Sequence, residues 1–214
     1  MAVGLDDDRW GGHSPPRLGS GSPEVPPHRP RPRRNDVLFV DSNVIYGSDC
    51  RLPLLLLAGA GLLEVNWSPF VAAEVARVAT REQAIATAAH ESTALRDELE
   101  RRRHEIDRVI ADHERYWHSP SPTDLRATYA TLPPNVVRDP KDVPVLAGAL
   151  ATRSSFLLTA NTKDFPHAQS YQYVVFWHPD TFLTAYFEDD SESYVFVCEE
   201  MPLALEKLGA ELQP

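Results

Sequence analysis

Short apolar runs separated by segments of helical character constrain the fold of this chain more than any other feature. A strand that is apolar at nearly every position must be buried on both faces, which is typical of a parallel sheet covered by helices. The runs that we interpret as strands are VLFV at 37–40, SFLLT at 155–159 and YVVFW at 173–177, with a further short strand at LEVNW, 63–67.

Helical patterns lie between these strands. Ser68 and Pro69 form a helix start, since serine is a good N-cap and proline fits the first turn. The helices that we expect cover about 53–60, 69–81, 84–117, the small-residue segment VPVLAGALA after Asp142, and HPDTFLTAYF after YVVFW. The alternation of strand and helix predicts an α/β fold with a doubly wound parallel sheet. YVFVCEE and LALEKL predict a last strand and helix, whose place we cannot assign.

The 214 residues suffice for one domain with appendages. Residues 1–34 are rich in Pro, Gly, Ser and Arg, and we expect a disordered tail. Its basic end at 29–34 could contact nucleic acid or simply keep the tail solvated. We expect the folded domain at 35–187 and an extension packed on it at 188–214.

The composition limits location and partners. The leucine-rich run at 52–63 is shorter than the roughly 20 residues of a membrane helix. Because the first residues are acidic and no apolar stretch follows them before Val37, we expect no secretory signal and a cytoplasmic protein. Cys50 and Cys198 lack CxxC spacing, which gives neither a disulfide framework nor a zinc site.

The charge also limits binding. The formal net charge is -10, although the first 34 residues carry more Arg than Asp and Glu. An acidic body repels phosphates unless a metal ion or a basic patch intervenes. If the substrate is RNA, we expect a divalent cation to be needed for binding as well as for chemistry.

Two carboxylates stand out in the first half of the chain. Asp41 directly follows VLFV, at the carboxyl end of a buried strand, where open α/β sheets bind their ligands. The alternative is that Asp41 caps the next turn with Ser42 and Asn43. Glu74 falls on the apolar stripe of its helix, so it needs a cation or an arginine as partner, unless that edge is exposed.

Further polar residues follow the later strands. Asp142 precedes a helix, where it could ligate a metal or cap the helix N-terminus, and Asp139 is mainly a turn residue or one that supports the ligands from behind. Thr159 ends SFLLT and could orient a carboxylate, with Asn161 close behind it. Asp164 could complete a site or cap the KDF turn.

Carboxylates gathered at one sheet edge raise one another's pKa unless a hard cation neutralises them. Oxygen ligands favour Mg²⁺ or Mn²⁺, and the eight histidines show no zinc-binding spacing. Such a cluster can activate water and stabilise an in-line displacement at phosphorus. Glycine-rich phosphate loops and a G-x-S-x-G elbow are absent from the sequence.

Five motifs in this order resemble the PIN-domain nucleases, particularly the VapC-like toxin ribonucleases and their relatives. They are VLFVDSNVIY, the AAEVAR helix, DPKDVPVLAGALA, FLLTANTKDF and VVFWHPDTFL, within about 36–187. The resemblance implies a three-layer α/β/α domain with a central parallel sheet.

The resemblance also implies a Mg²⁺- or Mn²⁺-dependent endoribonuclease with Asp41, Glu74 and Asp142 as catalytic metal ligands. From their positions we add Asp164 as a further candidate ligand, and the supporting residues that we predict are Asn43, Asp139, Thr159 and Asn161. A toxin of this kind would have a small antitoxin as partner and form homodimers. The family usually has T-x-D where this chain has Thr159 and Asn161, which leaves open whether Asp164 substitutes, whether one metal is held rather than two, and whether activity is reduced.

Other interpretations remain open. RRRH at 101–104 could face the substrate or form a solvated surface paired with glutamates. A haloacid-dehalogenase-like phosphatase would use Asp41 and Thr159, but Asn43 stands where a second acid would be needed. A non-catalytic PIN fold that binds RNA or protein is the alternative from a different class, motivated by Asn161 and the acidic body.

Overall fold

The computed structural model describes residues 30–47, 49–88, 119–165 and 170–211, together with six isolated positions between 93 and 104. The predicted tail up to residue 29 and most of the predicted helix at 84–117 lie outside the described residues. The six isolated positions are all helical.

A five-stranded sheet forms the centre of the molecule, in the order β2-β1-β3-β5-β4. The four predicted strands are confirmed and run parallel, whereas β4 pairs antiparallel with β5 at one edge. Their bounds are β1 Val37–Val40, β2 Glu64–Asn66, β3 Phe156–Leu158, β4 Ser170–Tyr171 and β5 Val174–Trp177.

Eight described helices and helical turns connect or follow the strands. They are α1 Ser42–Gly47, α2 Arg51–Gly59, α3 Pro69–Ala88, α5 Pro122–Thr131, α6 Val143–Ala151, α7 Pro179–Asp189, α8 Ser191–Glu211 and the 3-10 turn η1 Pro140–Asp142. A further 3-10 turn, η2 Thr162–Asp164, follows β3.

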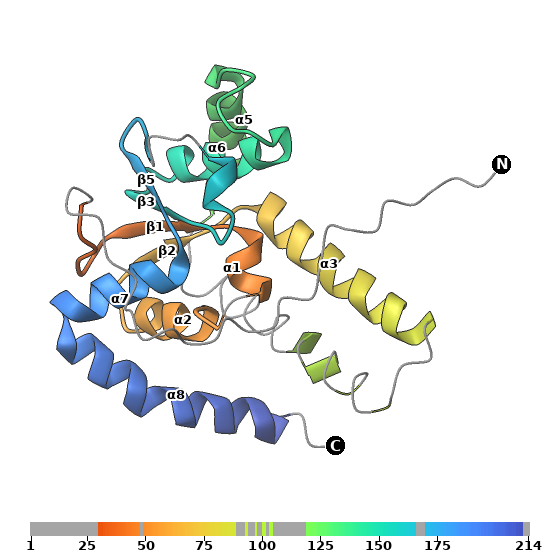
Figure 1. Cartoon of the computed structure of the whole chain (residues 1–214), viewed down its shortest axis with the longest axis vertical. Helices are drawn as coiled ribbons and strands as arrows, with labels where there is room; N and C mark the ends of the chain where they lie inside the picture. The colour runs from red at the N-terminus through yellow and green to blue at the C-terminus, as the bar shows by residue number, and fades with distance from the viewer. Residues whose placement is uncertain are drawn as a thin grey trace.

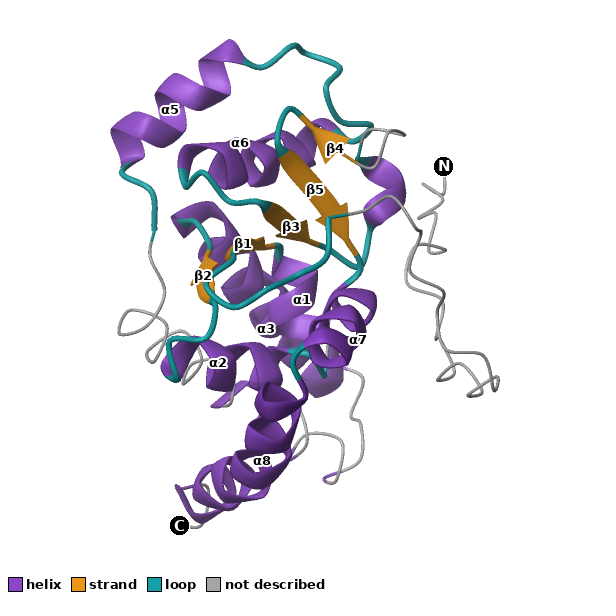
Figure 2. Ribbon diagram, turned by 90° about the vertical axis from the view of Figure 1, so that its left-hand side faces the viewer, coloured by secondary structure: helices purple, strands orange, loops and turns teal. Residues whose placement is uncertain are grey.

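The elements form three layers (Figure 1). Helix α6 lies on one face of the sheet with α5 outside it, and α2 and α7 lie on the other face with α8 outside them (Figure 2). This architecture is the predicted α/β fold and is compatible with a three-layer α/β/α domain. In Figure 1, β1 runs toward α1 and α3, so the carboxyl ends of the parallel strands face these two helices.

Apolar side chains fill the space between the layers. Leu38, Phe39 and Val40 have no exposed surface, as expected for a central strand covered on both faces. Helix α6 approaches β1 so closely that a Cβ atom built on Gly148 would lie 2.3 Å from Cζ of Phe39. A side chain at position 148 would therefore separate α6 from the sheet.

The structure corrects three predictions of secondary structure. YVFVCEE does not form a strand, because 191–211 is one continuous helix, α8. SPSPTD, predicted to end a helix, also begins one: Ser121 caps α5 by accepting a hydrogen bond from the Asp124 amide. The predicted break near residue 81 is also wrong, because α3 continues to Ala88.

The basic residues just before β1 are held against the corner between α7 and α8. Arg34 pairs with Asp190 at 2.5 Å and with Glu192 at 3.0 Å, and Arg31 pairs with Asp189 at 2.7 Å. The end of the predicted disordered tail thus makes specific contacts with the domain. No helix in the described part of the chain is long and apolar enough to cross a membrane.

Candidate carboxylate site

The Asp41 carboxylate is held rigidly at the carboxyl end of β1. Its side chain is buried, with 4% of its surface exposed, and its backbone amide still bonds β3 through the Leu158 carbonyl. Oδ1 accepts hydrogen bonds from the Ser42 amide at 2.7 Å and the Ser42 hydroxyl at 3.3 Å. Oδ2 accepts from Asn43 Nδ2 and from Thr159 Oγ1, both at 2.7 Å.

Thr159 links this carboxylate to the segment after β3. Its hydroxyl donates to Asp41 and accepts from Asn43 Nδ2 and from the Asn161 amide, each at 3.1 Å. The side-chain oxygen of Asn43 in turn accepts from the Ala160 amide at 2.9 Å. Thr159 therefore makes the predicted hydrogen bond to a carboxylate, and Asn43 bonds both Asp41 and Thr159.

Opposing effects set the pKa of Asp41. Burial raises it, and the negative charge of Glu74 adds to that effect. The hydrogen bonds from Thr159 and Ser42 lower it because they favour the charged carboxylate. Burial is the largest effect, so the pKa lies above its ordinary value.

Asp142 differs from Asp41 because its carboxylate is poorly satisfied. It occupies the N-cap position of α6 but makes no side-chain hydrogen bond to that helix, so the capping alternative is wrong. Its Oδ2 atom is buried and has no hydrogen-bond partner among the described residues. Such an orphaned oxygen is rare in a folded protein and calls for a missing partner.

Burial, together with the charges of neighbouring carboxylates, raises the pKa of Asp142 to about 7, and burial is the largest cause. These neighbours are Asp41, Asp139, Asp164 and Glu74. The structure therefore brings the predicted carboxylates close enough to act on one another electrostatically. A cation among them would relieve this repulsion.

Glu74 and Asp139 lie at the edge of the cluster. Glu74 is partly exposed on α3, and its Oε1 lies 3.6 Å from Nη2 of Arg77, the kind of partner that the apolar stripe suggested. Asp139 accepts a hydrogen bond from the Lys141 amide at 3.0 Å, which confirms its predicted turn role.

Asn161 and Asp164 face each other after β3. The Asn161 amide group donates a hydrogen bond to Oδ2 of Asp164. The backbone of Asp164 is fixed as well, because its carbonyl accepts from the Arg138 amide at 2.6 Å. Asn161 therefore occupies one oxygen of the carboxylate that was expected to complete the site.

The donor set partly fits a hard cation. All the donors are oxygens, and Asp142 offers an unused one. Asp41 already accepts four hydrogen bonds, about the capacity of a carboxylate, so the long contact with the Ser42 hydroxyl would have to yield. In the described residues, no three His, Cys, Asp or Glu side chains form a ready-made metal site.

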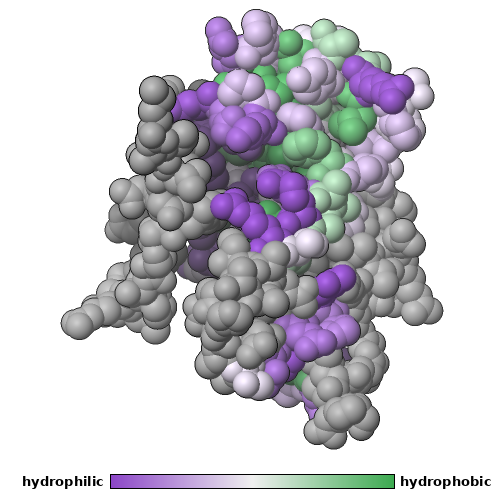
Figure 3. Space-filling view, turned by 90° about the vertical axis from the view of Figure 1, so that its right-hand side faces the viewer, coloured by the Kyte–Doolittle hydropathy of each residue, from purple (hydrophilic) through white to green (hydrophobic). Residues whose placement is uncertain are grey.

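Figure 3 looks onto the side of the molecule toward which β1 points in Figure 1, and it shows hydrophilic side chains gathered in the middle of that face.

The sequence predicted only a turn role for Ser42, although both its amide and its hydroxyl donate hydrogen bonds to Asp41. The position of Ser42, next to the strand-terminal aspartate, was the signal available.

The RRRH segment is described only in part. Arg101, Arg103 and His104 are exposed helical residues, and Arg102 lies outside the described residues. His104 Nε2 lies 4.0 Å from Oε1 of Glu100, a contact of the kind expected for a solvated face.

Comparisons with protein-family models, with curated proteins and with solved structures found no match for this chain. The resemblance to PIN-domain nucleases rests on the five motifs and stays a prediction.

Proposed function

We propose that the chain is a PIN-like, divalent-metal-dependent endoribonuclease that hydrolyses phosphodiester bonds of RNA. The observation that carries this proposal is the buried, unbonded Oδ2 atom of Asp142 among other carboxylates. A hydrogen-bonded structural cluster would satisfy that atom, whereas a Mg²⁺ or Mn²⁺ ion would use it as a ligand.

Asp41, Glu74 and Asp142 would hold the ion, with Asp164 as a further candidate. The bound cation would lower the pKa of a water molecule and stabilise the charge that develops on a phosphate. Thr159 and Asn43 fix the orientation of Asp41. The cation also offsets the repulsion between an acidic protein and an RNA backbone.

The decisive experiment is a cleavage assay on a labelled structured RNA in Mg²⁺, Mn²⁺ or EDTA. The wild-type protein should cut only with a metal, and Asp41→Asn and Asp142→Asn should abolish cutting. Asp49→Asn is the matched control, because Asp49 is exposed and the substitution removes the same charge. Cleavage that survives in EDTA, or that persists in both site variants, would refute the proposal.

A second candidate function is a non-catalytic module that binds RNA or protein. Two observations favour it. The Asn161 side chain donates a hydrogen bond to the Asp164 carboxylate, and the hydrogen-bonding capacity of Asp41 is already filled. Calorimetric titration separates the two functions, since this module would take up neither Mg²⁺ nor Mn²⁺ at millimolar concentration.

The toxin version of the nuclease makes further demands. If the chain is a toxin, we propose that it is a cytoplasmic protein that forms homodimers and that a small antitoxin covers its site. Expression of the wild type alone should then arrest growth, and Asp142→Asn should not. Metal-dependent cleavage without growth arrest would leave a nuclease that is not a toxin.

A further inference from the structure

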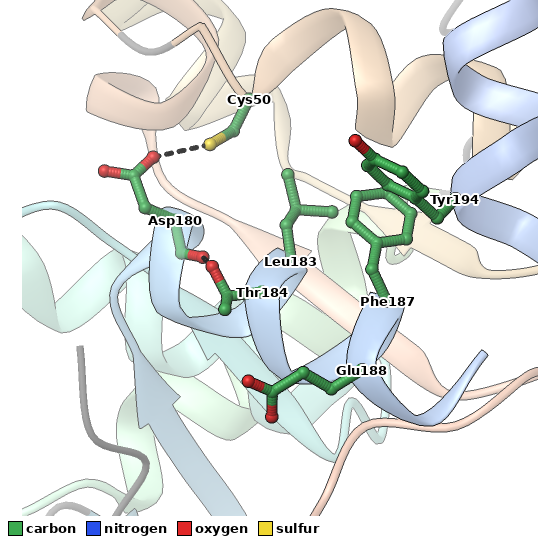
Figure 4. Close-up of a pocket in the computed structure, with 7 residues that line it drawn as sticks. All are labelled: Cys50, Asp180, Leu183, Thr184, Phe187, Glu188 and Tyr194. Carbon is green, nitrogen blue, oxygen red and sulfur yellow. Dashed lines mark hydrogen bonds between the residues drawn. The ribbon is translucent and has the colours of Figure 1, made fainter. Parts of the chain in front are cut away.

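A shallow pocket of about 520 Å³ lies between the N-terminal end of α2 and the helices α7 and α8 (Figure 4). Leu183, Phe187 and Tyr194 form an apolar wall, in which the rings of Phe187 and Tyr194 meet edge to face at 5.4 Å. None of the residues of the carboxylate site lines this pocket.

The charged groups among the described lining residues are acidic. Asp180 and Glu188 lie about two turns apart on α7, and no Lys or Arg is among the lining residues. Asp180 accepts a hydrogen bond from the Cys50 thiol at 2.7 Å and lies 3.4 Å from Nδ1 of His178. Glu188 is exposed and has no ion pair with any described residue. Among the described residues, the pocket thus combines negative charge with aromatic surface, and no Lys or Arg lines it.

Two carboxylates that follow Glu188 in the sequence pair with arginines of this chain. Asp189 and Asp190 directly follow Glu188, and they pair with Arg31 and Arg34. Arg34 binds Asp190 with two nitrogens, the fork geometry that guanidinium groups favour with carboxylates. Glu188 of the pocket therefore stands next in the sequence to two carboxylates that pair with arginines.

We propose that the α7–α8 pocket binds an arginine side chain presented by a basic segment of a partner protein. A guanidinium group can pair with Glu188 or Asp180 and stack on Phe187 or Tyr194, while its aliphatic stem packs on Leu183. This proposal does not depend on the ribonuclease function, because its residues are separate from the carboxylate site.

The test measures the anisotropy of a fluorescein-labelled hexapeptide of alternating Arg and Ala, titrated with the full chain. Glu188→Gln should weaken binding about three- to fivefold, as expected for an exposed ion pair. Tyr194→Ala should weaken it about two- to fivefold without changing the charge of the protein. A peptide with Lys in place of Arg should bind more weakly.

Two matched controls separate the pocket from general attraction to an acidic protein. Glu206→Gln removes the same charge from an exposed position of α8, and Tyr129→Ala removes a tyrosine of similar exposure from α5. Each should change the affinity less than about 1.5-fold, the behaviour of a site that is not contacted. Equal weakening by pocket and control variants would overturn the proposal.

The chain's own arginines are the competing occupant. Replacing Arg9, Arg17 and Arg29 with Gln in the full chain should leave the peptide affinity within twofold. A marked gain in affinity would show that the chain's own segment fills the pocket, and the assignment to a partner would then be wrong.

Discussion

Asp142→Asn should stabilise the metal-free protein above about pH 7. The pKa of Asp142 is raised from 3.8 to about 7 in the fold, so folding favours the protonated carboxyl. Its contribution to stability is fully present below about pH 4 and is lost as the pH rises through 7. The full shift would correspond to about 4 kcal/mol, but the side chain is partly exposed and solvent screens it, which leaves about 1–2 kcal/mol.

Urea unfolding followed by circular dichroism in EDTA, at about pH 4.5 and pH 8.5, measures this effect. Asp142→Asn should exceed the wild type by about 1–2 kcal/mol at pH 8.5 and by much less at pH 4.5. Asp49→Asn should show no such dependence. Adding Mg²⁺ should raise the stability of the wild type more than that of the variant. Loss of stability at pH 8.5 in Asp142→Asn would refute the reasoning, because the carboxylate would then have a favourable partner.

Two further substitutions test the packing and the hydrogen bonds of the site. Gly148→Ala should destabilise the protein by about 1–3 kcal/mol in urea unfolding, since the new methyl group overlaps the Phe39 ring. Gly59→Ala, which meets nothing within 4 Å, should be neutral or stabilising, and similar losses for both would contradict the close approach of α6. Thr159→Val should lower the unfolding free energy by about 1–3 kcal/mol, because it leaves buried partners without their hydroxyl. An unchanged unfolding midpoint for this variant would mean that Asp41 does not need that hydrogen bond.

The sheet was predictable because strands that are buried on both faces are apolar at nearly every position. The last helix was not, since Tyr194, Val195 and their neighbours favour strands by local propensity. In the structure Ser193 and Val197, four residues apart, are buried, whereas Tyr194 and Val195 are about half exposed. The buried residues therefore follow the spacing of a helix, and only the packing of α8 on α2 and α7 shows which residues are buried.

The positions of the site carboxylates were predictable from the sequence, but their hydrogen-bond partners were not. Asp41 and Thr159 could be placed together because both follow parallel strands that end at one edge. The sequence could not show that Asp142 leaves its helix uncapped, since capping and ligation use the same residue types. It also could not show that the Asn161 amide binds Asp164, which depends on the local turn.

The hydrogen bond between Asp41 and Thr159 joins residues that are 118 positions apart, and β1 pairs directly with β3. During synthesis on a ribosome, Asp41 therefore emerges long before the strand that seats its carboxylate. A nascent chain, or one cut short before β3, holds the first aspartate without the partner that orients it. The carboxylate site can thus be completed only after β3 and Thr159 have been synthesised.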